Sequence, residues 1–175
     1  MNTSSFMLTV EETKAVCPIG EQYGKQCQKE HTVPVLSCEG SCIRGEIARL
    51  AANQIAKEVP YRRECHGEIF TAPHSAIAQW AANAGHVVVI DGCFMKCHGR
   101  ILKNIIPENR LLQFDALAIH RKYSSIMDSD EVPEEERRQT ARHVAETILK
   151  HLKRGTISAC ASDAAVCCKE TACTS

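Results

Sequence analysis

Cysteine is the residue type through which this sequence could do chemistry, because it accounts for 11 of the 175 residues. Two pairs, Cys38 with Cys42 and Cys93 with Cys97, have a C-x3-C spacing, which lies within the range common in zinc sites. A fifth thiol, Cys65, lies between the two pairs in the chain. In a reducing compartment such thiols are more often metal ligands or redox groups than structural disulfides. The spacing therefore predicts metal or redox chemistry.

Metal binding is the favoured hypothesis, with no catalysed reaction expected. The two pairs would supply four thiolates in a tetrahedral shell, with Cys65 as a spare or alternative ligand. Zinc is the expected ion; another thiophilic metal, such as Cu(I), or arsenite is the alternative, because thiolates bind soft ions well. Both pairs are expected at or just before helix N-termini, where the partial positive charge stabilises the thiolate. A helix expected from Cys93 to Leu102 would place the sulfurs of Cys93 and Cys97 on one helical face.

The first cysteine pair also fits a competing hypothesis, a thiol-dependent enzyme. Cys38 and Arg44 have the C-x5-R spacing with which arsenate reductases and thiol phosphatases hold an oxyanion at a helix N-terminus. The loop resembles that of the low-molecular-weight phosphatases, although its second cysteine comes one position early. In this alternative Cys38 is the nucleophile, Arg44 the oxyanion clamp, and Cys93 or Cys97 the resolving thiol. Glu39 favours the metal hypothesis, because a carboxylate in the loop would repel a dianion and attract a cation.

Polar neighbours of these cysteines have a structural and a functional interpretation. Asp91 is expected to cap a helix through the amides around Cys93, and the alternative is that its carboxylate supports a ligand of a bound metal from outside the coordination shell. His66 and His98 each adjoin a candidate ligand and could join a mixed shell. Adjacent residues point to different faces, however, so an all-sulfur shell is favoured.

A third group of thiols lies near the end of the sequence, at Cys160, Cys167, Cys168 and Cys173. Vicinal cysteines in a flexible segment suit soft ions, because the chain can adapt to the geometry that the ion prefers. These auxiliary thiols could pass metal or electrons to the main site. The alternative is that they are incidental residues of a mobile tail.

Strands and helices that alternate along the chain must position the five central thiols. Strands are expected at residues 32–38, 62–66, 86–91, 111–114 and 116–120; helices are expected at 42–59, from a cap at Thr71 to Gly85, at 93–102, and from 133 to about 153, with Gly155 as the stop. This order is typical of an α/β protein with a three-layer, Rossmann-like fold and a mostly parallel sheet. Ligands in such sheets bind at the carboxyl ends of the strands, where the five thiols are expected to gather.

Three parts of the chain are expected from composition. Residues 1–31 are an irregular N-terminal arm, residues 32–155 form the α/β domain, and residues 156–175 are a flexible tail with too few large apolar side chains to offset the entropy of ordering.

Charge and hydropathy exclude several classes of protein. Lys and Arg number 21 and Asp and Glu number 21, so the net charge is zero, which argues against a nucleic-acid partner. No apolar run approaches the length that spans a membrane, and the first residues lack a basic start followed by an apolar stretch. We therefore expect a cytoplasmic protein whose partners are a metal ion and a redox or metal-transfer protein.

Residues 33–125 resemble the DGC domain family, which is named for an Asp-Gly-Cys motif after a hydrophobic strand. The motif is matched here by Val-Val-Val-Ile-Asp91-Gly92-Cys93 followed by Cys97, and a cysteine-glycine turn that leads into a helix is matched by Cys38-Glu-Gly40-Ser-Cys42-Ile-Arg-Gly45. Cys65 fits a further cysteine between the two motifs. The resemblance implies chelating cysteines that bind zinc, and it names no reaction.

Overall fold

The computed structural model describes residues 5–167, with side chains described for residues 5–154. The strands are β1 (Val33–Ser37), β2 (Tyr61–Arg63), β3 (Val87–Asp91) and β4 (Leu111–Asp115). The helices are α1 (Pro18–Lys29), α2 (Ile43–Ile55), α3 (His66–Thr71), α4 (Ala76–Asn83), α5 (Cys97–Leu102), α6 (Ala116–His120) and α7 (Glu134–Cys167), with short 3-10 turns η1 (Glu108–Arg110) and η2 (Ser129–Glu131).

The four strands form one parallel sheet in the order β2-β1-β3-β4. Every residue of β3 is buried, as expected for a β-branched run in a strand that is covered on both faces. Since all four strands run in the same direction, their carboxyl ends meet at one edge. The predicted α/β fold with a parallel sheet is confirmed.

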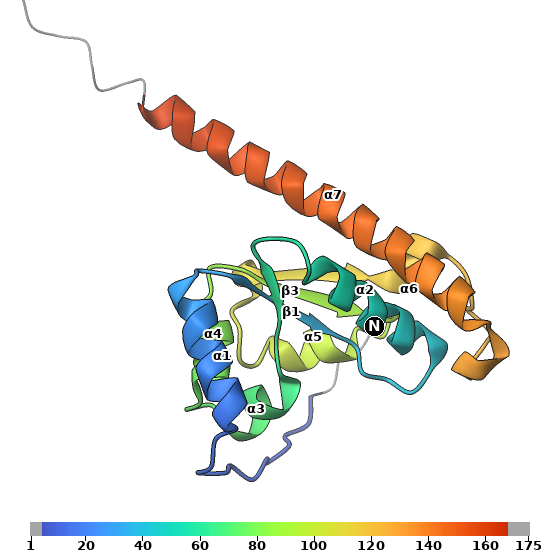
Figure 1. Cartoon of the computed structure of the whole chain (residues 1–175), viewed down its shortest axis with the longest axis horizontal. Coiled ribbons are helices and arrows are strands. Elements are labelled where there is room, and N and C mark those ends of the chain that lie inside the picture. Colours follow the sequence, from blue (N-terminus) through green and yellow to red (C-terminus); the bar gives the residue numbers. More distant parts are fainter. Residues whose placement is uncertain (1–4, 168–175) are drawn as a thin grey trace, which may run out of the picture.

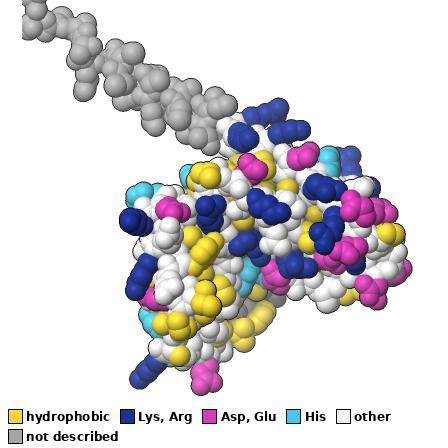
Figure 2. Space-filling model, viewed as in Figure 1, with side chains coloured by type: hydrophobic (Ala, Val, Ile, Leu, Met, Phe, Trp, Pro, Cys, Tyr) yellow, Lys and Arg dark blue, Asp and Glu magenta, His cyan; other side chains and the backbone are white. Residues whose placement is uncertain are grey.

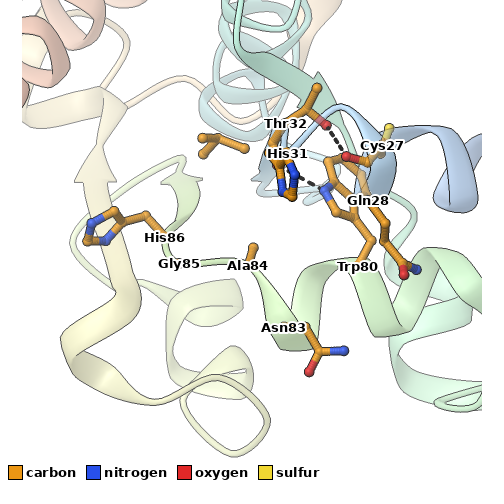
Figure 3. Close-up of a pocket in the computed structure, with 10 residues that line it drawn as sticks. Cys27, Gln28, His31, Thr32, Trp80, Asn83, Ala84, Gly85 and His86 are labelled. Carbon is orange, nitrogen blue, oxygen red and sulfur yellow. Dashed lines mark hydrogen bonds between the residues drawn. The ribbon is translucent and has the colours of Figure 1, made fainter.

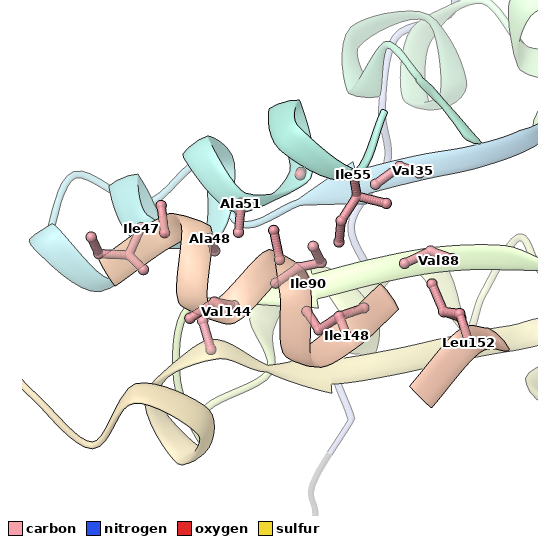
Figure 4. Close-up of a cluster of buried hydrophobic side chains, with 14 of the residues drawn as sticks. Val35, Ile47, Ala48, Ala51, Ile55, Val88, Ile90, Val144, Ile148 and Leu152 are labelled. Atoms are coloured by element: carbon pink, nitrogen blue, oxygen red, sulfur yellow. The ribbon is translucent and has the colours of Figure 1, made fainter. Parts of the chain in front are cut away.

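Helices α2 and α7 cover one face of this sheet (Figure 1). Apolar side chains at helical spacing along α2, such as Ile47, Ala51 and Ile55, pack with Val88 of β3 and Ile148 of α7 (Figure 4). All five are at most 1% exposed. Burying each large aliphatic side chain contributes about 1.5–3 kcal/mol to stability, so this cluster fixes α2 firmly against the strands.

Helices α3, α4 and α5 lie on the opposite face, where Ile69 of α3 and Leu102 of α5 belong to one apolar cluster with Leu36 and Val89 of the sheet. Successive strand residues alternate between the two clusters, as the two-residue period of a strand requires. Helix α1 packs on the outside of α4 (Figure 1). The result is the three-layer arrangement that the sequence predicted.

The N-terminal arm is not irregular throughout, because residues 18–29 form α1. Pro18 stands at its first turn, and the Cys17 sulfur accepts a hydrogen bond from the Gly20 amide at 3.4 Å. Glycine usually disfavours a helix, but Gly24 lets α1 approach α4 closely. A Cβ at this position would overlap the backbone at Ile77. The helix therefore depends on a tertiary contact that composition does not reveal.

Several predicted elements differ from those observed. Helix α2 ends at Ile55, and the residues before Pro60 form turns. Thr71 ends α3, and α4 is capped instead by Ser75, whose Oγ accepts from the Ala78 amide at 3.3 Å. Residues 116–120 form α6 and not a strand, because the Asp115 carboxylate caps them through the Ala118 amide at 3.0 Å.

The C-terminal helix was expected to stop at Gly155, whereas α7 continues to Cys167 (Figure 1). A single glycine costs a helix only about 1 kcal/mol relative to alanine, and the alanines that follow favour helix. Cys160 and Cys167 therefore lie on α7, in a stretch whose side chains are not described. Cys168 and Cys173 lie outside the described residues.

Charges of both signs are interspersed on the surface that Figure 2 shows, in keeping with the balanced composition. Within residues 5–167, no helix combines the length and the apolar character that crossing a membrane requires.

Candidate functional site

Cys38 lies beside residues 91–93 at the carboxyl edge of the sheet. Ser37, the last residue of β1, pairs with Ile90 of β3. One residue further along, the Cys38 amide donates a hydrogen bond to the Ile90 carbonyl at 2.8 Å. Each strand therefore delivers a cysteine to the edge soon after its last paired residue, so that Cys38 and Cys93 come close in the fold.

Cys97 completes a group of three thiols at this edge. Partial burial raises the pKa of the Cys97 thiol, repulsion from Cys38, Cys93 and Asp91 in their ionised forms raises it further, and Arg100 opposes these effects. These groups are close enough to repel a Cys97 thiolate electrostatically. A cation bound among them would reverse that repulsion, because an opposite charge favours the ionised form of a thiol.

The other two predicted thiols flank this group on different sides of the sheet. Cys42 occupies the N-cap position of α2 on one face, and Cys65 occupies that of α3 on the other; neither side chain makes a capping hydrogen bond. Among the residues whose side chains are described, no three or more Cys, His, Asp or Glu side chains are already arranged to hold a metal ion. The fold therefore gathers the thiols at one edge without closing a coordination shell.

Residues 92–96 form a loop, so the helix predicted from Cys93 begins only at Cys97. The Lys96 amide donates to the Cys93 carbonyl at 3.0 Å, and Lys96 has a left-handed backbone with φ of 51°. The sulfurs of Cys93 and Cys97 are consequently not stacked on one helical face.

Asp91 is the reason that the helix begins where it does. Its carboxylate is 1% exposed and accepts hydrogen bonds from the amides of His98 at 3.0 Å and Gly99 at 3.3 Å. The other carboxylate oxygen accepts from Gln113 Nε2 of β4 at 2.7 Å. Asp91 thus caps α5, and not the amides around Cys93 as the sequence had predicted. This capping fixes the backbone of Cys97 and His98 relative to β3 and β4.

Gly92 joins the two cysteine motifs by a close backbone contact. A Cβ at this position would lie 2.8 Å from both the carbonyl carbon and the oxygen of Arg44, in the first turn of α2. Only glycine permits this approach, so the loop after β3 rests directly on the start of α2. The geometry gives a packing reason for glycine between Asp91 and Cys93.

Some amides of the loop from Cys38 to Arg44 and of the start of α2 are hydrogen-bonded within the protein. The Ile43 amide donates to the Met127 carbonyl at 3.1 Å, and the Gly45 amide donates to the Cys42 carbonyl at 2.8 Å. The Gly40 amide donates to the Cys38 sulfur at 3.4 Å. An oxyanion site at a helix N-terminus requires such amides to point at the ligand. The Ile43 amide is therefore not available to bind an oxyanion.

Glu39 is held at the rim of the same loop. Its carboxylate accepts hydrogen bonds from Ser37 Oγ at 2.8 Å and from Arg63 of β2 at 3.2 Å. Arg63 also donates to the Val35 carbonyl at 3.1 Å, which ties β2 to β1. The negative charge of Glu39 is thereby paired with the Arg63 guanidinium.

Two Cys-His-Gly turns, residues 65–67 and 97–99, form a feature that spacing between cysteines did not reveal. The first opens α3 and the second opens α5. The rings of His66 and His98 meet with their centroids 5.0 Å apart and their planes at 80°. Burial, together with the charges of His98 and Arg63, lowers the pKa of His66 to about 4. The repeated tripeptide was the sequence signal that could have found this pair.

Glu64 adds a buried carboxyl group directly before the first of these turns. It is only 6% exposed, and burial raises its pKa to about 8. A nearby cation would stabilise the ionised form of a carboxyl group in such surroundings. The edge therefore combines thiols, imidazoles and carboxylates.

A cavity of about 400 Å³ lies at the opposite, amino-terminal edge of the sheet (Figure 3). Its walls include Cys27, His31, Trp80 and His86. Trp80 donates from its ring nitrogen to the Thr32 carbonyl at 3.0 Å. Cys27 is 1% exposed and packs with Trp80 as a small apolar side chain. This hollow is separate from the edge that carries the thiols of the two motifs.

Comparison with known proteins gives one positive finding. Residues 34–144 match the family model described as DGC domain, which confirms the resemblance found in the two cysteine motifs. No curated protein and no solved structure matches the chain.

Proposed function

The chain belongs to the DGC domain family, and we propose that it binds a thiophilic metal ion, zinc in the first place, through thiolates at the carboxyl edge of its sheet. The observation that carries the proposal is the hydrogen bond from the Cys38 amide to the Ile90 carbonyl at 2.8 Å. It sets Cys38 beside the Asp91-Gly92-Cys93 motif. Two cysteine motifs that are far apart in sequence are thereby joined at one place.

The donor chemistry of this edge suits such an ion. Cys38, Cys93 and Cys97 would supply three thiolates, whose mutual repulsion a cation would relieve. Cys42 or Cys65 would supply the fourth. Zinc is commonly held by four cysteines, and it needs the deprotonated thiol.

Binding requires only local movement of the protein. No closed shell is present among the described side chains, and the loops at residues 38–42 and 92–96 are parts of the edge that are not held in a helix or strand. Asp91 meanwhile keeps the start of α5 in place through the His98 and Gly99 amides. The Cys93 sulfur is therefore expected to move more than the Cys97 sulfur.

Elemental analysis of protein purified without oxygen tests the proposal. We expect one zinc per chain, or stoichiometric uptake of zinc or arsenite by protein stripped with a chelator. The Cys38→Ser variant should lose this uptake, and Cys17→Ser is the matched control because Cys17 is an exposed thiol at the start of α1. Absence of bound metal and of uptake in the wild type would contradict the proposal.

The same protein separates this function from that of a thiol-dependent enzyme. Metal binding predicts no turnover of arsenate, a disulfide or an aryl phosphate. Turnover that Cys38→Ser abolishes, in protein that takes up no metal, would favour the enzyme.

A further inference from the structure

The two Cys-His-Gly turns have the same sequence, and each opens a short helix. His66 is the first residue of α3, and His98 is the second residue of α5. Both helices pack on the same face of the sheet, where Ile69 and Leu102 share an apolar cluster. Each turn therefore begins its helix after the carboxyl end of a strand, β2 or β3, with the histidine directly after a cysteine.

The two imidazoles meet edge to face, and each has a buried ring nitrogen without a hydrogen-bond partner. Their centroids are 5.0 Å apart with the planes at 80°. His66 Nε2 and His98 Nδ1 are buried, and neither has a hydrogen-bond partner in the structure. Leaving a buried polar atom unpaired costs about 1–3 kcal/mol, and a missing ion is one of the ordinary explanations for such an atom.

The backbone of His98 and the ring of His66 each contact a neighbouring side chain. The Asp91 carboxylate accepts from the His98 amide at 3.0 Å, and Gln113 holds that carboxylate from the other side at 2.7 Å. His66 packs against Phe70 one turn later in α3, with ring centroids 6.1 Å apart. Metal sites need donors that are oriented by such supporting contacts.

We propose that His66 Nε2 and His98 Nδ1 enter the coordination shell of the ion that the edge thiolates bind, so that the shell is mixed sulfur and nitrogen. This inference rests on the proposed function and specifies the ligands of the same site. It replaces the all-sulfur shell that the spacing of the cysteines favoured. The unpaired nitrogens gain a partner, and the number of thiolates needed to complete four ligands falls to two.

A mixed shell has a consequence for the kind of ion. Imidazole suits zinc, whereas arsenite and Cu(I) are bound best by soft sulfur ligands. The histidines should therefore matter for zinc and should not matter for arsenite. This difference separates a ligand role from a general effect on folding.

X-ray absorption spectroscopy of the zinc-loaded full-length protein tests the inference without any substitution. We expect sulfur scatterers at about 2.3 Å together with imidazole nitrogen at about 2.0–2.1 Å. A spectrum with sulfur alone would overturn the inference while leaving the proposed function intact. A wild type that takes up neither zinc nor arsenite would overturn both.

Substitutions of the two histidines then test whether their ring nitrogens are the zinc ligands. In His66→Gln and His98→Gln we expect zinc affinity to fall by at least about tenfold, since even the loss of a group that supports a ligand costs that much. In the double variant the imidazole signature should vanish, and arsenite affinity should be retained. His86→Gln is the matched control, because His86 is an exposed histidine at the amino-terminal edge. An imidazole signature that survives in the double variant, or equal losses of zinc and arsenite affinity, would refute the assignment.

Discussion

Gln113 and Asp91 meet across the β3–β4 pair, where Gln113 Nε2 donates a hydrogen bond to Asp91 Oδ2 at 2.7 Å. The other oxygen of Asp91 accepts from the amides of His98 and Gly99. One buried carboxylate therefore ties the two central strands to the first turn of α5. Its contacts make the aspartate of the motif a structural residue in the first place.

Asp91→Asn should destabilise the protein by about 1–3 kcal/mol, because an amide side chain has one acceptor oxygen and cannot serve both sets of donors. Urea unfolding measures this effect. Asp128→Asn is the matched control: Asp128 is exposed and caps the short turn η2 through the Asp130 amide at 3.0 Å. Its effect should stay within about 0.5 kcal/mol. Equal effects of the two substitutions would contradict the role given to Asp91.

Gly92→Ala should destabilise the protein by about 1–3 kcal/mol, because the added carbon would press on the Arg44 backbone at 2.8 Å. Gly85→Ala is the control, since a Cβ there meets nothing within 4 Å. That substitution should be neutral or slightly stabilising, because it restricts the unfolded chain. Thermal unfolding of both variants makes the comparison, and a tolerated alanine at Gly92 would show that the loop is not pressed against α2.

His120 should make stability depend on pH. It is 8% exposed, its Nδ1 accepts from the Lys122 amide at 2.9 Å, and burial lowers its pKa to about 4. Between pH 6.5 and 4 this residue is protonated in the unfolded chain but stays neutral in the folded chain. Stability should therefore fall as the pH is lowered through this range, by up to about 3 kcal/mol, and be unaffected by this group above it.

Urea unfolding at several pH values measures that dependence. His120→Gln should flatten the curve between pH 6.5 and 4, whereas the exposed His151→Gln should leave it unchanged. The difference between the two variants isolates His120 from other titrating groups. Parallel curves for both variants would contradict the prediction.

Zinc should stabilise the folded chain by mass action. Free zinc at 100 times its dissociation constant is expected to add about 2.7 kcal/mol to the free energy of unfolding. A chelator should reverse the gain, and Cys93→Ser should lack it. The same gain in Cys93→Ser as in the wild type would exclude Cys93 as a ligand.

The sheet was predictable because its strands carry local signals. The β-branched run of β3 and the apolar residues of β4 are recognisable without tertiary context. α1 and α6 were missed for opposite reasons. Glycines that permit close packing resemble breakers in α1, and a short apolar run after Asp115 has no period long enough to distinguish helix from strand.

Only the part of the candidate site that follows from the order and direction of the strands was predictable. Parallel strands must deliver Cys38 and Cys93 to one edge, so cysteine spacing and strand order suffice to place them together. The start of α5 at Cys97 depends on a carboxylate that reaches seven residues along the chain to the His98 amide. The contact of His66 with His98 joins two turns on separate helices, and the repeated Cys-His-Gly tripeptide marks the two turns but not their contact.

Helices α2 and α5 stand on opposite sides of the strands, and each begins with or just after a cysteine of the edge. An ion bound by both Cys42 and Cys97 would link α2 and α5 across the carboxyl edge of the sheet, and so would connect the two outer layers. Because α2 packs along α7, an ion bound at this edge would also restrain the long C-terminal helix through α2.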